Sequence, residues 1–279
     1  MKKVAAIQMA SGSNVAANLL EAERLITQAA AEKANLIVLP ENFALIDKED
    51  HALLNIAEDY NSGPLQKFLS QQAVKHKLWI VGGTIPLKSS NPKKIRAASL
   101  LFNDEGQCIA RYDKLHLFDV SLPSGNEKYC ESSAIESGEK TVVVDTPIGR
   151  LGLAVCYDLR FPELFRCLVD EGMEVLVLPS AFTAITGKAH WESLLRARAI
   201  ENLCYVIAAG QGGFHTSGRT THGDSMIVDP WGTILTRLPR GAGVITAELD
   251  PERLNSTRRN FPTINHRRID CKLAPKYPT

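Results

Sequence analysis

The stretch "LGLAVCYDLRFPELFR" (residues 151–166) begins with an apolar run that ends at Cys156. Two polar residues, Tyr157 and Asp158, follow directly, and Pro162 then opens a segment with the pattern of a helix, because proline is well tolerated in the first turn. A strand, a short turn and a helix in this order are typical of layered α/β proteins. Two interpretations of Cys156 remain open: a buried core thiol at a strand end, or a nucleophile at a strand-to-helix turn.

The alternation of strands and helices continues on both sides of this stretch. The chain opens with a strand over 3–9, a helix over 14–33 capped by Asn14, and an apolar strand over 35–42 that Pro40 stops. Such a β-α-β unit predicts parallel pairing with a right-handed crossover. Further strands are expected over 78–86, 173–182, 203–210 and 243–250, helices over 64–77, 162–172 and 190–202, and hairpins over 96–114, 141–156 and 222–238.

The order of these elements predicts a layered α/β fold with two sheets and helices outside them. No repeat, low-complexity segment or linker rich in proline, serine or glycine divides the chain. We therefore expect a single domain over residues 1–279, with 260–279 as a C-terminal tail.

The composition argues against several function classes. Of the 279 residues, 44 % are hydrophobic and 23 % are charged, and the formal net charge is +1, so we expect binding neither to nucleic acid nor to a membrane. The basic cluster at 266–268 is interpreted as a solvated or oligomer-facing part of the tail. The sequence lacks the long apolar core of a secretory signal and any apolar run of transmembrane length, so we expect a cytoplasmic protein.

Six cysteines are spread along the chain, at positions 108, 130, 156, 167, 204 and 271. None belongs to a C-x-x-C pair and none accompanies closely spaced histidines, so no metal site is expected. The even number does not by itself predict disulfides in a chain of this size without a secretory signal. We expect reduced thiols.

Three reactive side chains follow apolar or mostly apolar strands. "LIVLP" delivers Glu41, "IARYD" delivers Lys114, and "LGLAV" delivers Cys156. The carboxyl ends of strands are where sites assemble in α/β sheets. A thiol needs a base or a cation nearby to act as a nucleophile, a carboxylate can take its proton, and an ammonium group can stabilise an oxyanion. Together the three residues predict nucleophilic catalysis on a carbonyl.

Each residue taken alone has a simpler interpretation. Cys156 can be a small buried hydrophobic residue, Glu41 a surface carboxylate at a strand end, and Lys114 a solvated side chain or a partner of Asp113 or Asp119. The spacing between the three is not a local motif, so the residue types alone leave both interpretations open.

Three segments together resemble the signatures of the nitrilase superfamily of carbon–nitrogen hydrolases. They are "LPENF" (39–43), "RYDKLHLFD" (111–119) and "GLAVCYDLRFPE" (152–163), in the order of that family. The resemblance implies a four-layer αββα sandwich, a homodimer or higher homo-oligomer, and no metal or organic cofactor. It implies that Glu41 is the general base, Lys114 the lysine on the oxyanion side and Cys156 the nucleophile.

The resemblance also implies a second glutamate beside the lysine. Glu131 in "YCES" matches it, although Glu127 and Glu136 are nearby competitors in an irregular segment over 120–138. The simpler interpretation of Glu131 is a loop carboxylate.

Two further segments, "PSAFTAITGKAHWESLLRARAIEN" (179–202) and "HGDSMIVDPWGT" (222–233), resemble the branch that acts as deaminated glutathione amidase. The related ω-amidase branch tends to carry Cys in place of Asn42 and Asn in place of Thr183. The first branch implies that the keto-acid half of the substrate is held by Arg160, Phe182 and Thr186, and that the Tyr157 N–H completes the oxyanion hole. Alternatively, Arg160 pairs with Asp158 or Glu163 to shape the turn, and Phe182 is plain core.

The expected function is hydrolysis of deaminated glutathione to α-ketoglutarate and Cys-Gly through a thioester on the cysteine, a metabolite repair. The alternatives are an ω-amidase acting on α-ketoglutaramate or another short-chain amide, and a non-catalytic interaction module. The segment "GQGGFHTSG" (210–218) lacks the fingerprints of nucleotide-binding loops and is interpreted as a mobile glycine loop near the site, in which contacts of His215 or Arg219 with the Cys-Gly half stay open.

Overall fold

The computed structural model describes residues 2–48, 50–122, 128–216 and 218–271. Its strands are β1 (Lys2–Gln8), β2 (Leu36–Val38), β3 (Trp79–Val81), β4 (Ile85–Lys88), β5 (Ile95–Phe102), β6 (Cys108–Asp113), β7 (Asp119–Ser121), β8 (Lys128–Cys130), β9 (Val143–Thr146), β10 (Gly149–Leu153), β11 (Val175–Ser180), β12 (Tyr205–Gly210), β13 (Gly212–Phe214), β14 (Thr220–His222), β15 (Ser225–Val228), β16 (Ile234–Leu238) and β17 (Gly243–Leu249). Its α-helices are α1 (Val15–Ala31), α2 (Pro64–His76), α3 (Pro162–Asp170), α4 (Ala184–Asn202) and α5 (Pro251–Asn260), and its 3-10 turns are η1 (Asp50–Ile56), η2 (Glu131–Ser133) and η3 (Cys156–Arg160).

The first sheet has the strand order β17-β1-β2-β3-β5-β4, and β6 pairs with β5 at its side. β1, β2 and β3 are parallel neighbours, which confirms the pairing predicted for the opening β-α-β unit. Side chains alternate across β1, so Val4 and Ala6 join one core cluster and Ala5 and Ile7 join another. The strand is apolar throughout because both of its faces are covered.

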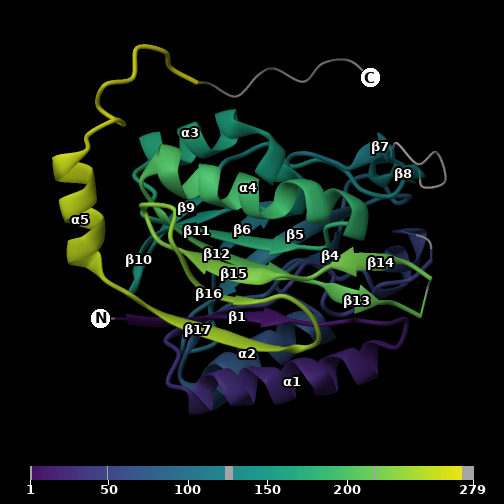
Figure 1. Ribbon diagram of the computed structural model, residues 1–279. Coiled ribbons are helices and arrows are strands. Elements are labelled where there is room, and N and C mark those ends of the chain that lie inside the picture. The colour runs from purple at the N-terminus through teal and green to yellow at the C-terminus, as the bar shows by residue number, and fades with distance from the viewer. Residues whose placement is uncertain (1, 49, 123–127, 217, 272–279) are drawn as a thin grey trace.

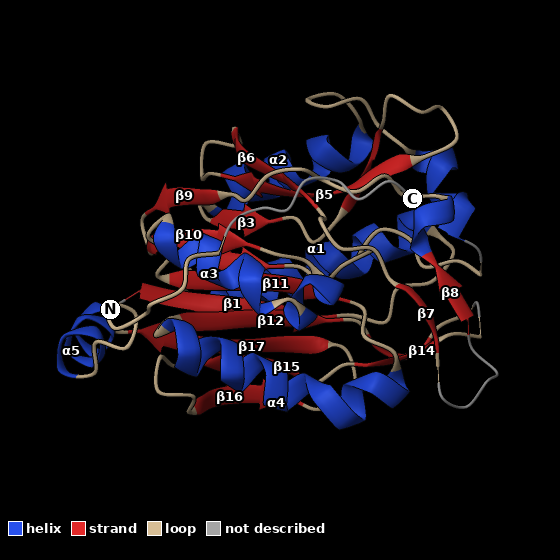
Figure 2. Cartoon of the chain, turned by 90° about the horizontal axis from the view of Figure 1, so that it is seen from above, coloured by secondary structure: helices blue, strands red, loops and turns tan. Residues whose placement is uncertain are grey.

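The second sheet has the order β16-β15-β12-β11-β10-β9 and contributes to the larger core cluster between the sheets. Helices α1 and α2 cover the outer face of the first sheet, and α3 and α4 cover the outer face of the second (Figure 1). Viewed from above, α4 runs along the strands of the sheet beneath it (Figure 2). This arrangement confirms the predicted four-layer αββα sandwich.

Two predicted elements differ from the structure. The strand predicted over 78–86 is divided into β3 and β4 at Gly82 and Gly83, because Gly83 adopts φ 56° and a side chain there would run into the carbonyl oxygen of Pro40. The helix predicted over 190–202 begins earlier, at Ala184, and Thr183 caps it by accepting a hydrogen bond from the Thr186 N–H.

Part of the segment predicted as a glycine loop over 210–218 is a strand, and residue 217 lies outside the described residues. This strand, β13, pairs antiparallel with β14, and Gly212 lies opposite His222 in the register. This pairing places β14 beside the first residues of α4.

The C-terminal region leaves the sheets through α5, which extends from one end of the molecule (Figure 1). In the predicted tail over 260–279, residues 272–279 lie outside the described part. Arg267 pairs with Asp170 of α3, so the basic cluster is not wholly solvated. Within the described residues, no helix is long and apolar enough to cross a membrane.

Candidate active site

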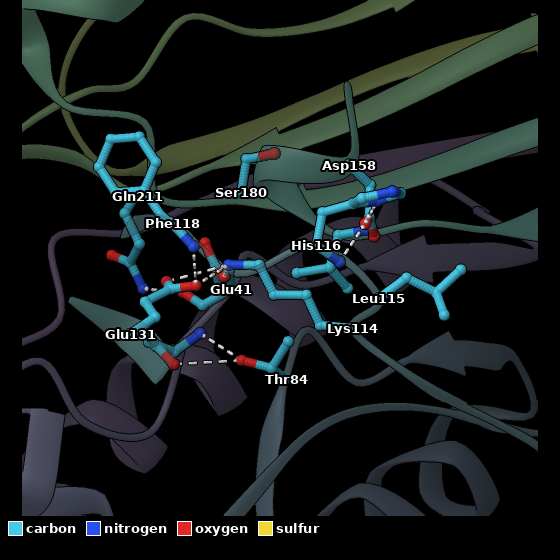
Figure 3. A network of polar contacts seen from close by, with 12 residues as sticks. Glu41, Thr84, Lys114, Leu115, His116, Phe118, Glu131, Asp158, Ser180 and Gln211 are labelled. Atoms are coloured by element: carbon cyan, nitrogen blue, oxygen red, sulfur yellow. Dashed lines mark hydrogen bonds and ion pairs between the residues drawn. The ribbon is translucent and has the colours of Figure 1, made fainter. Parts of the chain in front are cut away.

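The fold brings two of the predicted strand-end residues into direct contact. Glu41 follows β2 and Lys114 follows β6, and the Lys114 Nζ lies 2.8 Å from the Glu41 Oε1 (Figure 3). The Lys114 side chain is fully buried and that of Glu41 nearly so. Removing either partner of an ion pair buried in this way would be costly, because the other charge would be left in the interior without compensation.

Glu131 is the second carboxylate on the same ammonium group. Its two oxygens lie 2.8 and 3.0 Å from the Lys114 Nζ, and one also accepts a hydrogen bond from the Phe118 N–H. Glu136 instead pairs with Arg96, and Glu127 lies outside the described residues. Glu131 is therefore the described glutamate of this segment that lies beside the lysine, as predicted.

Burial and charge set the protonation of this cluster. Burial raises the pKa of Glu41, and the ammonium group of Lys114 acts against that rise. Burial acts to lower the pKa of Lys114, but the charges of Glu131 and Glu41 outweigh it, so this pKa lies well above its usual value. Lys114 therefore stays charged, while Glu41 is a carboxylate that takes up a proton more readily than a solvated one.

Cys156 is the first residue of η3 and follows the end of β10 by three residues. Its backbone has φ 46°, a left-handed conformation that costs energy for any residue with a side chain. Such a turn points the thiol away from the direction that a strand or helix would give it. Cys156 is 8 % exposed, and burial followed by the Glu41 charge raises the pKa of its thiol well above the usual value. A hydrogen bond from this thiol in turn lowers the pKa of Glu41.

Asp158 holds the turn that carries Cys156, a role the sequence did not reveal. Its fully buried carboxylate accepts hydrogen bonds from the Val155 N–H at 2.8 Å, the Tyr112 hydroxyl at 2.7 Å and the His116 N–H at 3.1 Å. His116 Nδ1 lies 2.7 Å from the same carboxylate (Figure 3). Asp158 thus ties the start of η3 to the segment that directly follows Lys114.

A narrow cleft opens above the cluster. Its lining brings together every site residue predicted from the sequence apart from Lys114, which lies beneath it. The lining residues are Glu41, Asn42, Phe118, Glu131, Cys156, Tyr157, Arg160, Ala181, Phe182, Thr183, Thr186 and Arg219.

Arg160 faces this cleft without an ion-pair partner among the described residues. Asp158 is engaged elsewhere, so the predicted alternative of an ion pair with it does not occur. The Arg160 guanidinium instead lies 3.1 Å from His190 Nδ1 and 5.1 Å from the centre of the Phe182 ring. Burial lowers its pKa, although an arginine with this chemistry stays charged near neutral pH.

Phe182, Thr186 and Tyr157 have structural partners as well as a place in the cleft. Phe182 packs on Trp191 with ring centres 4.9 Å apart. The Thr186 hydroxyl lies 2.8 Å from that of Thr183, the helix cap. The Tyr157 ring is held edge-on against Phe118, 5.0 Å away. Each of these residues is therefore set in place before a ligand arrives.

A second network fixes the backbone around Glu41. Gln211 donates from its amide to the Glu41 carbonyl at 3.1 Å and to the Ser11 hydroxyl at 2.8 Å. Asn42 adopts φ 54°, and its N–H donates to the Thr84 hydroxyl at 2.9 Å. Gln211 and Thr84 were not predicted, because their partners are distant in the sequence.

Residues 3–259 match the family model for carbon–nitrogen hydrolases. The chain is 42 % identical to the deaminated glutathione amidase of Yersinia enterocolitica, over 98 % of this chain and 95 % of that protein. It is 41 % identical to the human deaminated glutathione amidase, over 96 % of this chain and 82 % of that protein.

Solved structures share the fold. The NitFhit protein of Caenorhabditis elegans superposes with a TM-score of 0.89 and 38 % identity, over 96 % of this chain and 65 % of that one. A Saccharomyces cerevisiae member of branch 10 of the nitrilase superfamily gives a TM-score of 0.86 and 35 % identity, over 96 % and 97 % of the two chains. The similarity thus extends over nearly the whole chain and is not limited to three motifs.

Proposed function

This chain belongs to the carbon–nitrogen hydrolase family of the nitrilase superfamily, and we propose that it hydrolyses the amide of deaminated glutathione to α-ketoglutarate and Cys-Gly. The observation that carries this proposal is one shared cleft. Cys156, Glu41, Glu131 and Arg160 line it, and the buried Lys114 lies beneath it, paired with both glutamates. That set supplies a nucleophile, a base, a cation for the oxyanion and a cation for a substrate carboxylate.

Catalysis begins with the thiol and Glu41. Burial keeps the Cys156 thiol protonated at rest because it raises the pKa of the thiol. Glu41 accepts that proton as the sulfur attacks the amide carbonyl, so a free buried thiolate need not accumulate. The carbonyl π electrons move to oxygen, which becomes the oxyanion of a tetrahedral intermediate.

Lys114 and the Tyr157 N–H stabilise that oxyanion in the proposed mechanism. Glu131 holds the lysine in place with two hydrogen bonds, so little reorganisation is needed as charge develops. Glu41 then gives its proton to the departing amine, the C–N bond breaks and a thioester remains on Cys156. A water molecule deprotonated by Glu41 attacks the thioester, which releases the keto acid and returns the proton to the thiol.

Arg160 binds the carboxylate of the keto-acid half. Its guanidinium can form two parallel hydrogen bonds with a carboxylate, and the described residues offer it no competing ion pair. Phe182 packs against the short carbon chain, and the Thr186 hydroxyl donates to the keto acid. The reaction recovers both halves of a deaminated metabolite, which is a repair function.

We also propose a homodimer or higher homo-oligomer that works in the cytoplasm. Trp231 and Phe261 are exposed apolar side chains that pack on each other, with ring centres 5.4 Å apart. An exposed pair of this kind favours burial against a second copy. All six cysteines are unpaired, which is consistent with a reducing compartment.

The proposed substrate is tested by kcat/KM on deaminated glutathione and on α-ketoglutaramate, with Cys156→Ala as the blank. We expect a clear preference for deaminated glutathione. A preference for α-ketoglutaramate would instead indicate an ω-amidase. Activity on neither would leave Arg160, Phe182 and Thr186 wrongly assigned.

A further inference from the structure

The cleft contains a second arginine, Arg219, that the proposed mechanism does not use. Arg219 precedes β14 in the segment that joins β13 to β14, and it lines the same cleft as Cys156 and Arg160. Its guanidinium carbon lies 5.0 Å from the centre of the Tyr129 ring, a cation–π contact that places the charge at the end of an aromatic surface.

That aromatic surface runs from one arginine to the other. The ring of Tyr129 lies 5.1 Å from that of Phe118, and Phe118 lies 5.0 Å from Tyr157. At the far end, the guanidinium carbon of Arg160 lies 5.8 Å from the centre of the Tyr157 ring. Three adjoining rings therefore form a wall with a guanidinium group at each end.

The nucleophile is not midway along this wall. Cys156 directly precedes Tyr157 in the chain, and the Tyr157 ring contacts Arg160, whereas Arg219 contacts the ring at the other end of the wall. Deaminated glutathione has the same asymmetry. The carboxylate of its keto acid lies a short carbon chain from the scissile carbonyl, whereas its second carboxylate lies at the far end of a dipeptide.

The segment that carries Arg219 is anchored to the core. His215 is 4 % exposed, and its ring nitrogens lie 2.7 Å from the Ser11 carbonyl oxygen and 2.7 Å from the Thr221 hydroxyl. The His215 N–H donates to the Arg219 carbonyl at 2.9 Å. The backbone of Arg219 is therefore hydrogen-bonded to the backbone of a residue whose own side chain is buried and anchored, as a built recognition element requires.

We propose that Arg219 is a specificity-determining residue that binds the glycine carboxylate of the leaving Cys-Gly, while Phe118, which lines the cleft, packs along the dipeptide. The inference rests on the proposed function and deepens it: the two arginines select a substrate with a carboxylate on each side of the amide. α-Ketoglutaramate, whose leaving group is ammonia, engages only Arg160.

The test combines a change in the enzyme with the matching change in the substrate. The kcat/KM of wild type and Arg219→Gln is measured on deaminated glutathione and on the same compound with the glycine carboxylate replaced by a carboxamide. Either change alone is expected to lower kcat/KM by about 10- to 100-fold, the range for a lost charge-assisted hydrogen bond. Both changes together are expected to lower it little further, and Arg219→Lys is expected to fall between.

Arg240→Gln is the matched control, because Arg240 is exposed and lines a separate groove beside β13. This variant should prefer the acid over the carboxamide by the same factor as the wild type. Equal kcat/KM of the wild type on acid and carboxamide would overturn the inference without any variant. An Arg219→Gln enzyme slowed by the same factor on acid, carboxamide and α-ketoglutaramate would overturn it too. A wild type inactive on deaminated glutathione would remove the proposed function itself.

Discussion

Cys156 and Cys204 are two buried thiols of one core cluster, and only one of them faces a cleft. Burial raises the pKa of both: that of Cys204 to about 12, and that of Cys156 well above its usual value. Both thiols are buried, so both are protonated near neutral pH.

Their neighbours differ. The Cys204 Sγ donates to the Arg198 carbonyl at 3.8 Å, between α4 and β12, where it fills space. Cys156 occupies a left-handed turn beside Glu41, above the buried Lys114. A protonated thiol can act as a nucleophile when a base and a cation lie beside it, so in the proposed mechanism Cys156 stays protonated until a substrate arrives.

The largest expected effect separates the two cysteines by activity. Cys156→Ala should lower kcat on deaminated glutathione by at least about 10⁴-fold, because no other group can form the thioester. Cys204→Ala should leave kcat within about twofold and cost about 1 kcal/mol of stability, measured by thermal unfolding. Turnover retained by Cys156→Ala would refute the proposed mechanism.

Removing the cation should affect both activity and folding. Lys114→Met is expected to lower kcat by about 10²- to 10³-fold, through loss of an oxyanion donor. It should also cost about 3–5 kcal/mol of unfolding free energy, because two buried carboxylates lose their partner. Activity assays and urea unfolding measure the two effects.

Lys88→Met is the matched control for this change. Its ammonium group pairs with Asp59 at the same 2.8 Å, but both side chains are more than half exposed. Such a pair contributes no more than about 1 kcal/mol. Equal losses of stability in the two variants would show that the buried cluster is not the stronger one.

A smaller effect should come from the group that positions Cys156. Asp158→Asn keeps the shape but turns an acceptor into a donor that faces the N–H and O–H groups around it. We expect kcat to fall by about 10- to 100-fold with a smaller change in KM, because the thiol is displaced rather than removed. The control is Asp145→Asn, which lies in an exposed ion pair with Arg150 and should change neither kcat nor KM. An unaltered kcat in Asp158→Asn would show that the turn places the thiol without the help of the Asp158 carboxylate.

Much of this site is local enough to be predicted from the sequence. Glu41, Lys114 and Cys156 each follow the end of a strand within three residues, and the end of a strand restricts where the next side chains lie. The resemblance to a family then predicts that these three residues, which are distant in the sequence, share one catalytic site. The contact between Lys114 and Glu41 supports this prediction.

The rest depends on contacts between distant segments. Asp158 binds Tyr112 and His116, more than forty residues before it, and no local pattern marks that role. The early start of α4 has a similar cause: Gly187 is a weak helix former, but its missing side chain leaves room for the His222 ring of β14. Tertiary packing outweighed local propensity there.

The last prediction uses pH to compare the two thiols and Glu41. Alkylation by iodoacetamide, followed for each cysteine by peptide mass spectrometry, should modify Cys156 at a rate that follows the carboxylate form of Glu41. Protonation of Glu41 removes the base, so the rate should fall about tenfold per pH unit on the acid side of its pKa. Because burial raises that pKa above 4.5, the fall should begin at a higher pH than for a solvated glutamate.

Glu41→Gln should abolish this acid limb and leave a rate that rises only with alkaline ionisation of the thiol itself. Cys130 is exposed, so its alkylation shows that the reagent is present and active at each pH. Cys204 should stay unmodified throughout, because the reagent cannot reach it and no base among the described residues lies beside it. If Cys156 in the wild type followed the same alkaline curve as in Glu41→Gln, the carboxylate would not be the base. The difference between the two buried thiols would then rest on access to the cleft alone.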